Sequence, residues 1–438
     1  MKKFILHLTV SLILLSSGII HAQNYWLNSY SPTNINLKRV MFLDSLKGWA
    51  VGDSGIIIHT SNGGTNWTFQ NSKTKAFLHD VFFLNERLGW ALGWNVYNPQ
   101  PPYGSYYLKT TDGGVHWDTS FFPMENVFLW KVYFQDSLHG FLGGATKNLL
   151  RTTDGGANWI DVQIDSLNVM NFPVTNFAFY NNDYGYAVGG IKDICGLIWR
   201  TTNRGVRWTP IIVSPEPNLN MFFLDSLRIL GFGGDAEYGS SLITTSNSGA
   251  NWKYISLEIF GLPTVLASRD LKDLWGSIGY GRTFIFSQDS GKSFTLVPTP
   301  DTSVINDIVF PDKKHGIAVG ENGKILKFNS TTVGIVNHYA IVTKDFELKQ
   351  NYPNPFNPST TISYELSRRS FVVLKIFDVT GKEIKTLING FQNEGKYNLK
   401  FGSDFLTSGV YFYRIVARDL RGKGNEFFTQ TKKMLLIK

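Results

Sequence analysis

The sequence predicts an all-β protein, a seven-bladed β-propeller followed by a small immunoglobulin-like β-sandwich. Three observations lead to this prediction. A short motif built from Asp or Asn, Gly and a closing aromatic residue recurs six times. Its copies are separated by intervals close to the size of a propeller blade. The last part of the chain lacks the motif and instead alternates strand-like segments with turns.

The repeated motif has the form Ser/Thr-x-Asp/Asn-x-Gly-x-x-Trp/Phe, and its closing aromatic residues are 50, 42, 49, 44 and 42 residues apart. The Asx residue can accept hydrogen bonds from nearby backbone N–H groups, and the Gly two positions later can adopt positive φ. We therefore assign the six Asx residues a structural role in tight turns. The copies are TSNGGTNW (60–67), TTDGGVHW (110–117), TTDGGANW (152–159), TTNRGVRW (201–208), TSNSGANW (245–252) and SQDSGKSF (287–294), with Asn62, Asp112, Asp154, Asn203, Asn247 and Asp289 as the Asx residues.

Upstream of each copy of the motif lies a glycine-rich segment such as GWAVG or GWALG, and an apolar run precedes most of these segments. Each unit therefore predicts four short strands, with the motif turn between the third and the fourth. A seventh unit, residues 308–328, lacks the motif and the last strand. The segment NYWLNSY (24–30) can supply that strand with Trp26 as its aromatic residue. This closure joins the two ends of the ring and hides both open edges.

The six turns resemble Asp-boxes, the motif of sialidase-type and sortilin-type propellers. The fuller unit, GWAVG followed by TTDGGxxW, resembles photosystem II stability/assembly factor-like (BNR-type) repeats over residues 24–334. This resemblance implies a propeller whose Asp-boxes are structural. It does not imply a role in photosynthesis, because it lies in the repeat unit.

The C-terminal part resembles the type IX secretion sorting domain (Por secretion tail) of Bacteroidetes-like bacteria. NYPNPFNPST, IFDVTGKEI, SGVYFYRI and the terminal KKMLLIK match that family in order. The resemblance implies that residues 346–438 are read by the type IX outer-membrane machinery after a linker at 335–345. It also implies a protein that is secreted or attached to the cell surface after passing through the periplasm.

The N-terminus predicts a cleaved signal peptide at residues 1–23. Lys2 and Lys3 precede an apolar run, and Ala22 offers a small residue for cleavage. The run is short and carries polar residues, so we expect no transmembrane segment after signal removal. Cys195 is the single cysteine, which excludes an internal disulfide.

The formal net charge of +8 does not indicate a nucleic-acid partner. Residues 344–438 hold 16 Lys and Arg against 9 Asp and Glu, so the rest of the chain is close to neutral. No nucleic-acid-binding motif accompanies the basic tail. We therefore expect no nucleic-acid binding.

No catalytic residue, metal site or cofactor is predicted from the sequence. No histidine pattern such as HExxH is present, and the arginine motif expected of a sialidase is absent from the repeats. The leading hypothesis is a non-catalytic, exported propeller that binds an unknown protein or glycan at the cell surface. The alternative is a carbohydrate-active hydrolase that uses the loop carboxylates Asp193, Asp235 and Glu237.

Two features are candidate binding sites. The residue three positions before the motif Asx is cationic or ionisable in four successive units: His59, Lys109, Arg151 and Arg200. Such residues can form a cationic arc for an acidic partner, or they can brace their own hairpins.

The second feature is an insertion in the second unit, residues 93–107, which is rich in aromatic residues. Trp94, Tyr97 and Tyr103 can stack on a sugar or a peptide, or cover the loop itself.

The tripeptide Asp-Ser-Leu recurs at residues 44–46, 136–138, 165–167 and 225–227. It resembles the short O-glycosylation acceptor of Bacteroidetes-like bacteria. Asp and Ser are also favoured in turns, so these positions can equally be turns between the first and second strands of a blade.

Overall fold

A computed structural model describes residues 25–437 except 96–102, 146–148, 166–171, 236–238, 258, 260, 332–345, 367–368, 380–381, 404–405 and 420–425. The predicted signal peptide (1–23) and the predicted linker (335–345) lie outside the described residues. Tyr97 and Glu237 lie outside them too. The described part is built from β-strands with a few single-turn 3₁₀ segments, which confirms the all-β class. It contains no helix long and apolar enough to cross a membrane.

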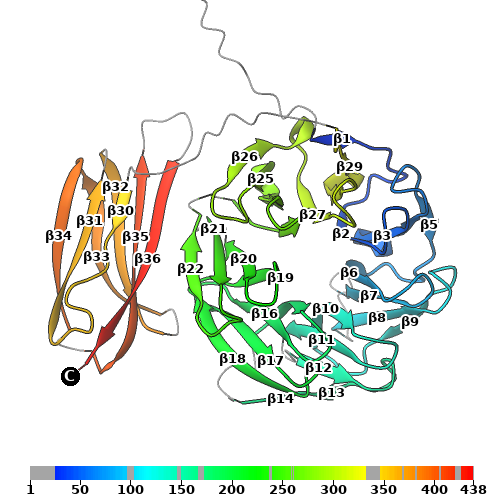
Figure 1. Cartoon of the computed structure of the whole chain (residues 1–438), viewed down its shortest axis with the longest axis horizontal. Coiled ribbons are helices and arrows are strands. Elements are labelled where there is room, and N and C mark those ends of the chain that lie inside the picture. Colours follow the sequence, from blue (N-terminus) through cyan, green and yellow to red (C-terminus); the bar gives the residue numbers. More distant parts are fainter. Residues whose placement is uncertain are drawn as a thin grey trace, which may run out of the picture.

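The described residues of the first part form seven antiparallel sheets arranged around a central axis (Figure 1). Where both are labelled in Figure 1, as for β6 and β9 or β19 and β22, the first strand of a blade lies nearest the axis and the last strand lies outermost. The first strands contact one another in a closed series from β2 through β27 and back to β2.

Blade one consists of β2 (Leu37–Phe42), β3 (Gly48–Gly52), β4 (Ile57–Thr60) and β5 (Thr68–Gln70). Blade two consists of β6 (Phe77–Phe83), β7 (Gly89–Trp94), β8 (Ser105–Thr110) and β9 (Asp118–Phe121). Blade three consists of β10 (Phe128–Phe134), β11 (Gly140–Ala145), β12 (Leu149–Thr152) and β13 (Ile160–Asp161). Blade four consists of β15 (Val174–Phe179), β16 (Gly185–Ile191), β17 (Cys195–Thr201) and β18 (Arg207–Ser214). A short strand, β14 (Gln163–Ile164), pairs parallel with β18 at its outer edge. Blade five consists of β19 (Asn218–Phe223), β20 (Ile229–Asp235), β21 (Gly239–Thr245) and β22 (Lys253–Ser256). Blade six consists of β23 (Val265–Ser268), β24 (Leu274–Ser277), β25 (Thr283–Ser287) and β26 (Thr295–Pro298). Blade seven consists of β27 (Ile305–Val309), β28 (Ile317–Gly320), β29 (Ile325–Phe328) and the N-terminal strand β1 (Trp26–Asn28).

The glycine that opens the second strand of a blade makes room for an aromatic ring. A Cβ on Gly89 would lie 2.4 Å from the ring of Phe83, and a Cβ on Gly140 would lie 2.6 Å from the ring of Phe134. These rings reach the neighbouring blade, where Phe83 stacks on Trp49 and Phe134 on Trp90, with centroids 3.6 Å apart in both pairs. The glycine-rich segments are therefore needed for packing between blades.

The ring closes through the N-terminal strand, as the sequence predicts. β1 pairs antiparallel with β29, with Trp26 opposite Phe328 and Asn28 opposite Leu326. Trp26 is buried and lies against Trp275 and Phe284 of blade six. The first strand of the described chain thus completes the last blade and covers its edge.

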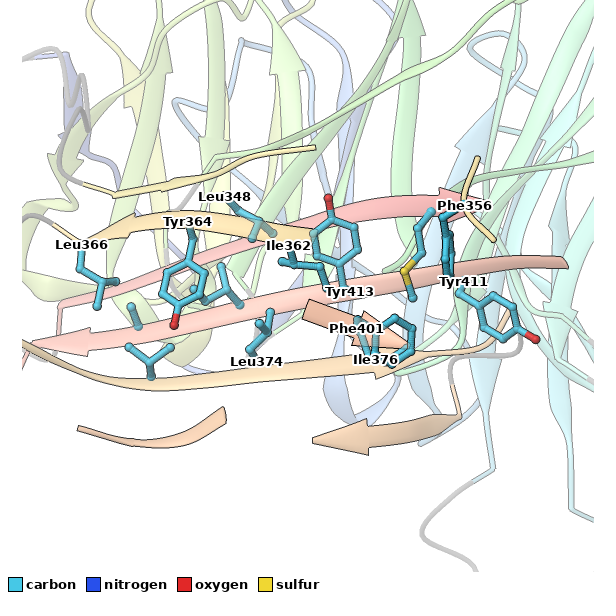
Figure 2. Close-up of a cluster of buried hydrophobic side chains, with 14 of the residues drawn as sticks. Leu348, Phe356, Ile362, Tyr364, Leu366, Leu374, Ile376, Phe401, Tyr411 and Tyr413 are labelled. Carbon is cyan, nitrogen blue, oxygen red and sulfur yellow. The ribbon is translucent and has the colours of Figure 1, made fainter. Parts of the chain in front are cut away.

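The C-terminal part is a sandwich of two sheets beside the propeller (Figure 1). One sheet has the order β30 (Phe346–Leu348), β31 (Ser359–Leu366), β34 (Gly395–Gly402). The other has the order β33 (Glu383–Gln392), β32 (Ser370–Phe377), β35 (Gly409–Asp419), β36 (Glu426–Leu436). Figure 2 shows the core between them, in which Ile362 and Tyr364 of the first sheet lie close to Leu374, Ile376 and Tyr413 of the second.

The proline-rich segment that precedes β31 packs on the last strand of the chain. The N–H of Phe356 donates to the carbonyl of Leu435 at 2.9 Å, and the N–H of Ile437 donates to the carbonyl of Phe356 at 3.1 Å. Asn351 is fixed from the core, because its N–H donates to the Tyr413 hydroxyl at 2.7 Å. The terminal segment therefore forms an edge strand held by the motif NYPNPFNP.

Candidate binding surface

The six motif turns share one hydrogen-bond pattern. In blade two, Asp112 Oδ1 accepts from the Thr110 hydroxyl at 2.9 Å and from the N–H of His116 at 2.9 Å, while Gly114 N–H donates to the Thr110 hydroxyl at 2.8 Å. Gly114 has φ +88°, a left-handed conformation that favours glycine. The same bonds recur at Asn62, Asp154, Asn203, Asn247 and Asp289.

The motif carboxylates are occupied by these local bonds. The N–H of His116 and the N–H of Asn158 hold the pKa values of Asp112 and Asp154 at about 2, below the usual value for an aspartate. Asn makes the same N–H bond in blades one, four and five. A turn that works equally well with an uncharged amide does not need a metal or a proton-transfer role.

The closing aromatic residues pack against the preceding blade. Trp117 of blade two joins a buried cluster with Trp49 of blade one, and Trp208 of blade four lies edge-on to Phe141 of blade three at 5.7 Å. Trp26 extends this pattern to the junction between blades seven and six. The aromatic of each motif is therefore part of the contact between blades.

The turn between the first and second strands also has a common geometry. In all seven described blades an Asp or Asn side chain accepts the N–H groups two and three residues later, as Asp136 does from Leu138 and His139 at 2.8 Å. The Asp-Ser-Leu tripeptides at 44–46, 136–138 and 225–227 occupy such turns. Asp165 does not: it follows β14 at the outer edge, where it pairs with Arg207.

The predicted arc residues occupy equivalent positions on third strands, next to the motif turns. His59 pairs with Trp49, Lys109 with Trp90, Arg151 with Phe141 and Arg200 with Tyr186 of the second strands. The register also identifies a fifth member that the sequence analysis missed. Lys327 pairs with Ile317 at the same position of blade seven, a unit without the motif by which the others were found.

The arc is interrupted in blades five and six, where the equivalent residues are Thr244 and Phe286. The five arc residues (Lys327, His59, Lys109, Arg151 and Arg200) therefore follow one another through blades seven, one, two, three and four.

Two of the arc side chains bridge adjacent blades. Lys109 Nζ donates to the carbonyl of Gly155 at 2.8 Å, and Lys327 Nζ donates to the Thr65 hydroxyl at 3.1 Å. Arg200 lies over the Tyr184 ring at 5.4 Å. Burial and the nearby Lys47 lower the pKa of His59, so this ring is uncharged at neutral pH.

The arc cations keep their charge uncompensated within the part of the chain that the structure describes. None of the five arc residues forms an ion pair with a described Asp or Glu, whereas neighbouring cations such as Lys47, Arg204 and Arg207 do. Arg151, at the centre of the arc, is half-buried. The arc therefore has four positive charges at neutral pH, on Lys327, Lys109, Arg151 and Arg200.

Trp94 does not stand out into solvent. Its Nε1 donates to the carbonyl of Leu129 at 2.7 Å, and its ring lies 4.4 Å from His79 and 5.7 Å from Trp130. Tyr103 is 41% exposed near the start of β8. Trp94 therefore packs between blades two and three, whereas Tyr103 lies on the surface, where a ligand could reach it.

A network of four charges near the axis was not found from the sequence. Asp80 accepts from Lys131 at 2.7 Å and from the N–H of Val132 at 2.8 Å, and Arg39 lies 3.4 Å from Asp80 and 3.3 Å from Asp307. Each of the four follows a register shift in the first strand of its blade. Aligning the first strands by these positions would have placed them together.

The loop carboxylates of the hydrolase alternative lie in different surroundings. Asp193 is exposed in a turn with φ +63°, whereas Asp235 is 3% exposed at the end of β20. Glu237 lies outside the described residues. The described residues also contain no group of three His, Cys, Asp or Glu placed to hold a metal ion.

Comparison with known families identifies two segments of the chain. Residues 109–255 match the family described as photosynthesis system II assembly factor YCF48, and residues 350–423 match the secretion system C-terminal sorting domain. The protein is therefore an exported propeller with YCF48-like repeats, and its tail directs it to secretion, with attachment to the cell surface or release.

Among individual proteins, the chain is 24% identical over 322 residues to the photosystem II assembly lipoprotein Ycf48 of Synechococcus sp. strain CC9902, covering 69% of this chain and 87% of that protein. A solved structure of YCF48 bound to D1 peptide aligns with a TM-score of 0.55 and 21% identity, covering 70% of this chain and 97% of that one. A GH74 xyloglucanase from Xanthomonas campestris aligns with a TM-score of 0.56 and 13% identity, covering 77% and 59%. At these identities the solved structures show the propeller fold alone.

Proposed function

We propose that this protein is a non-catalytic binding module that holds an acidic segment of a partner protein on its propeller outside the cell. The observation that carries the proposal is the arc of uncompensated cations at the equivalent position of successive blades. Cations repeated at one position attract a partner with several carboxylates more strongly than scattered, paired cations do.

The comparisons support a peptide-sized ligand. A propeller of similar fold has been solved with a bound peptide, and that fold covers most of the present ring. The motif turns, by contrast, are fully engaged in local bonds. The two buried carboxylates near the axis, Asp80 and Asp307, both lie against Arg39 instead of facing each other as a free acid and a free nucleophile would. These features favour binding over hydrolysis.

The proposal is tested with a fluorescent hexaglutamate peptide and the full chain. We expect saturable binding that weakens as salt is raised, because the arc cations are partly exposed and salt screens their attraction for the peptide. Arg151→Glu, at the centre of the arc, should weaken binding at least tenfold. Lys292→Glu is the matched control, because Lys292 is an exposed cation in the motif turn of blade six, where the arc is absent.

Three outcomes would contradict the proposal. Equal loss of binding in the Arg151→Glu and Lys292→Glu proteins would show that only net charge matters. Turnover of any member of a polysaccharide panel, abolished by Asp235→Asn, would establish the hydrolase instead. Tight binding of an acidic polysaccharide without turnover, together with no binding of hexaglutamate, would replace the protein partner with a glycan.

A further inference from the structure

The sandwich contacts the propeller through a buried ion pair. Arg414 of β35 lies with its Nη2 3.0 Å from Oε1 of Glu216, which is in the segment between β18 and β19. The exposed fractions of the two side chains are 8% and 2%. Charges are this deeply buried only when they are paired, so the pair is a buried polar contact between the two domains.

The propeller alone holds the Glu216 carboxylate in position. The Tyr254 hydroxyl donates to Glu216 Oε2 at 2.7 Å. The backbone of the same segment is fixed because the Ser214 hydroxyl donates to the Glu216 carbonyl at 2.7 Å and Asn218 Nδ2 donates to Ser214 at 3.0 Å. All four residues belong to blades four and five or the segment joining them, so the acceptor for a cation is built without the sandwich.

The two domains share little apolar surface around this pair. The buried cluster of the sandwich contains residues of the sandwich only, and the seven described clusters of the propeller contain residues of the propeller only. Two open clefts lie at this interface, one lined in part by Arg414 and the other by Tyr254. One, of about 160 Å³, is lined by Ile212 and Lys375, and the other, of about 490 Å³, by Trp252 and Lys433. Such an interface can separate without exposing a core.

The guanidinium of Arg414 makes several contacts at once, which a simple point charge could not. Its Nε donates to the Thr431 hydroxyl at 2.9 Å, and its planar head lies 5.3 Å from the centroid of the Phe377 ring while Nη2 reaches Glu216. On the propeller side, Tyr254 and Trp252 border the cleft beside the carboxylate. A carboxylate next to aromatic rings suits arginine better than lysine, because a guanidinium can stack and donate at once.

We propose that Glu216 and Tyr254 form an arginine-binding site of the propeller, which Arg414 fills in the unprocessed chain and which binds an arginine side chain of an extracellular protein once the sorting domain has left. The site is separate from the cation arc and of opposite charge. The proposal includes the removal of the sorting domain from the exported propeller. In the unprocessed chain the tail keeps the site closed to other ligands.

Burial is consistent with a site that needs a cation. Burial raises the pKa of the Glu216 carboxyl, and Arg414 opposes this effect. Asp235 of the propeller adds to the rise. The clefts beside this interface also carry charged side chains of both signs: Asp193, Lys375, Asp378 and Glu383 in one, and Lys432 and Lys433 in the other. Loss of Arg414 leaves a desolvated carboxyl that regains its ionised form most readily by taking up another guanidinium.

The test uses the full chain with its tail arginine replaced. In Arg414→Gln the site is vacated, because the guanidinium that contacts Glu216 is replaced by a shorter, uncharged amide. The probe is the tripeptide acetyl-Gly-Arg-Gly-amide, titrated by calorimetry. We expect it to bind Arg414→Gln at least tenfold more tightly than the wild-type chain, in which Arg414 competes from within the same molecule. The lysine analogue, acetyl-Gly-Lys-Gly-amide, should bind more weakly.

The matched control is the double variant Glu216→Gln/Arg414→Gln, which should lose the arginine tripeptide. Equal binding to the single and double variants, or no binding to Arg414→Gln, would overturn the proposal. Hexaglutamate binding to the arc, measured on the same samples, separates this failure from a failure of the proposed function.

A second measurement avoids any damage to the sandwich core from the substitution at Arg414. A specific protease site placed within residues 335–345 allows the otherwise unaltered chain to be nicked, and gel filtration then reports whether the two parts stay together. We expect excess arginine tripeptide, but not the lysine analogue, to promote separation, and Glu216→Gln to separate without any peptide. A nicked chain that behaves identically with both peptides and with Glu216→Gln would also overturn the proposal.

Discussion

Asn354 and Leu435 join the two ends of the sorting domain: Asn354 Oδ1 accepts the N–H of Leu435 at 2.8 Å. Asn354 lies in the proline-rich segment at the start of the domain, and Leu435 lies in β36 at its end. The neighbouring bonds between Phe356, Leu435 and Ile437 extend this contact on both sides. Two motifs that lie far apart in the sequence therefore form one structural unit at the edge of the sandwich.

This unit predicts the effect of removing the last seven residues, Lys432–Lys438. The truncated chain loses Met434 and Leu436 from the sandwich core and the partners of Asn354. We expect it to accumulate in the periplasm while its propeller stays folded, because no described propeller core contains residues from this segment. Cell fractionation of the native host, with protease resistance of the propeller as the folding control, measures both effects.

A milder change tests whether the contact itself matters. Asn354→Ala removes the acceptor of the Leu435 N–H and should destabilise the sandwich by about 1 kcal/mol. We expect reduced but detectable surface delivery. Full surface delivery of the chain lacking residues 432–438 would show that this strand is not needed for sorting.

Closure of the ring by the N-terminal strand predicts a large effect of Trp26. Its ring is 3% exposed and lies against aromatic residues of blades six and seven. Trp26→Ala should lower the free energy of unfolding by about 3–5 kcal/mol, as expected for a buried Trp. Leu27→Ala is the matched control, because Leu27 is adjacent in β1 but 48% exposed. Equal urea midpoints for the two variants would contradict closure.

The propeller was predictable because each repeat contains a turn that requires particular residue types at fixed spacing. The turn of Thr110, Asp112 and Gly114 requires a small donor, an acceptor and positive φ at fixed spacing, and few other residues meet those needs. Closure was predictable for a related reason: blade seven lacked a fourth strand and Trp26 had no other unit to join. Both inferences need only sequence-local patterns and a count of strands.

Contacts that depend on three-dimensional register could not be predicted in the same way. Lys327 is the equivalent of Lys109 only when β28 and β29 are aligned, because no motif marks its blade. The pairing of Glu216 with Arg414 joins residues nearly two hundred positions apart in two domains whose periodicities are unrelated. Nothing local to either residue indicates its partner.

The axial network predicts that Asp80 is essential for stability. It is completely buried and neutralises Lys131 while also accepting the N–H of Val132. Asp80→Ala leaves that N–H and Lys131 without their acceptor and removes one of the two carboxylates beside Arg39, which should lower the free energy of unfolding by roughly 3 kcal/mol. Asp80→Asn, which can keep the N–H bond, should be less harmful. A chemical denaturation series in which Ala and Asn have equal effects would show that charge alone matters.

The motif turns predict a specific response to acid. In the folded protein the pKa of Asp112 and of Asp154 is held at about 2, chiefly by the N–H groups of His116 and Asn158. A folded-state pKa below the unfolded value means that these residues stabilise the fold above the usual aspartate pKa. That contribution is lost as the pH falls from about 4 through about 2.

Replacing both residues by Asn should therefore flatten the acid response. Asn62 already makes the equivalent bond, to the N–H of Asn66 at 2.9 Å, without a titrating group. We expect the urea midpoint of Asp112→Asn/Asp154→Asn to fall less between pH 4 and pH 2 than that of the wild-type chain. The converse variant, Asn62→Asp, adds a titrating acceptor in the same geometry and should make the fall steeper. Parallel pH profiles for all three proteins would mean that the motif carboxylates do not stabilise the folded turns through their charge.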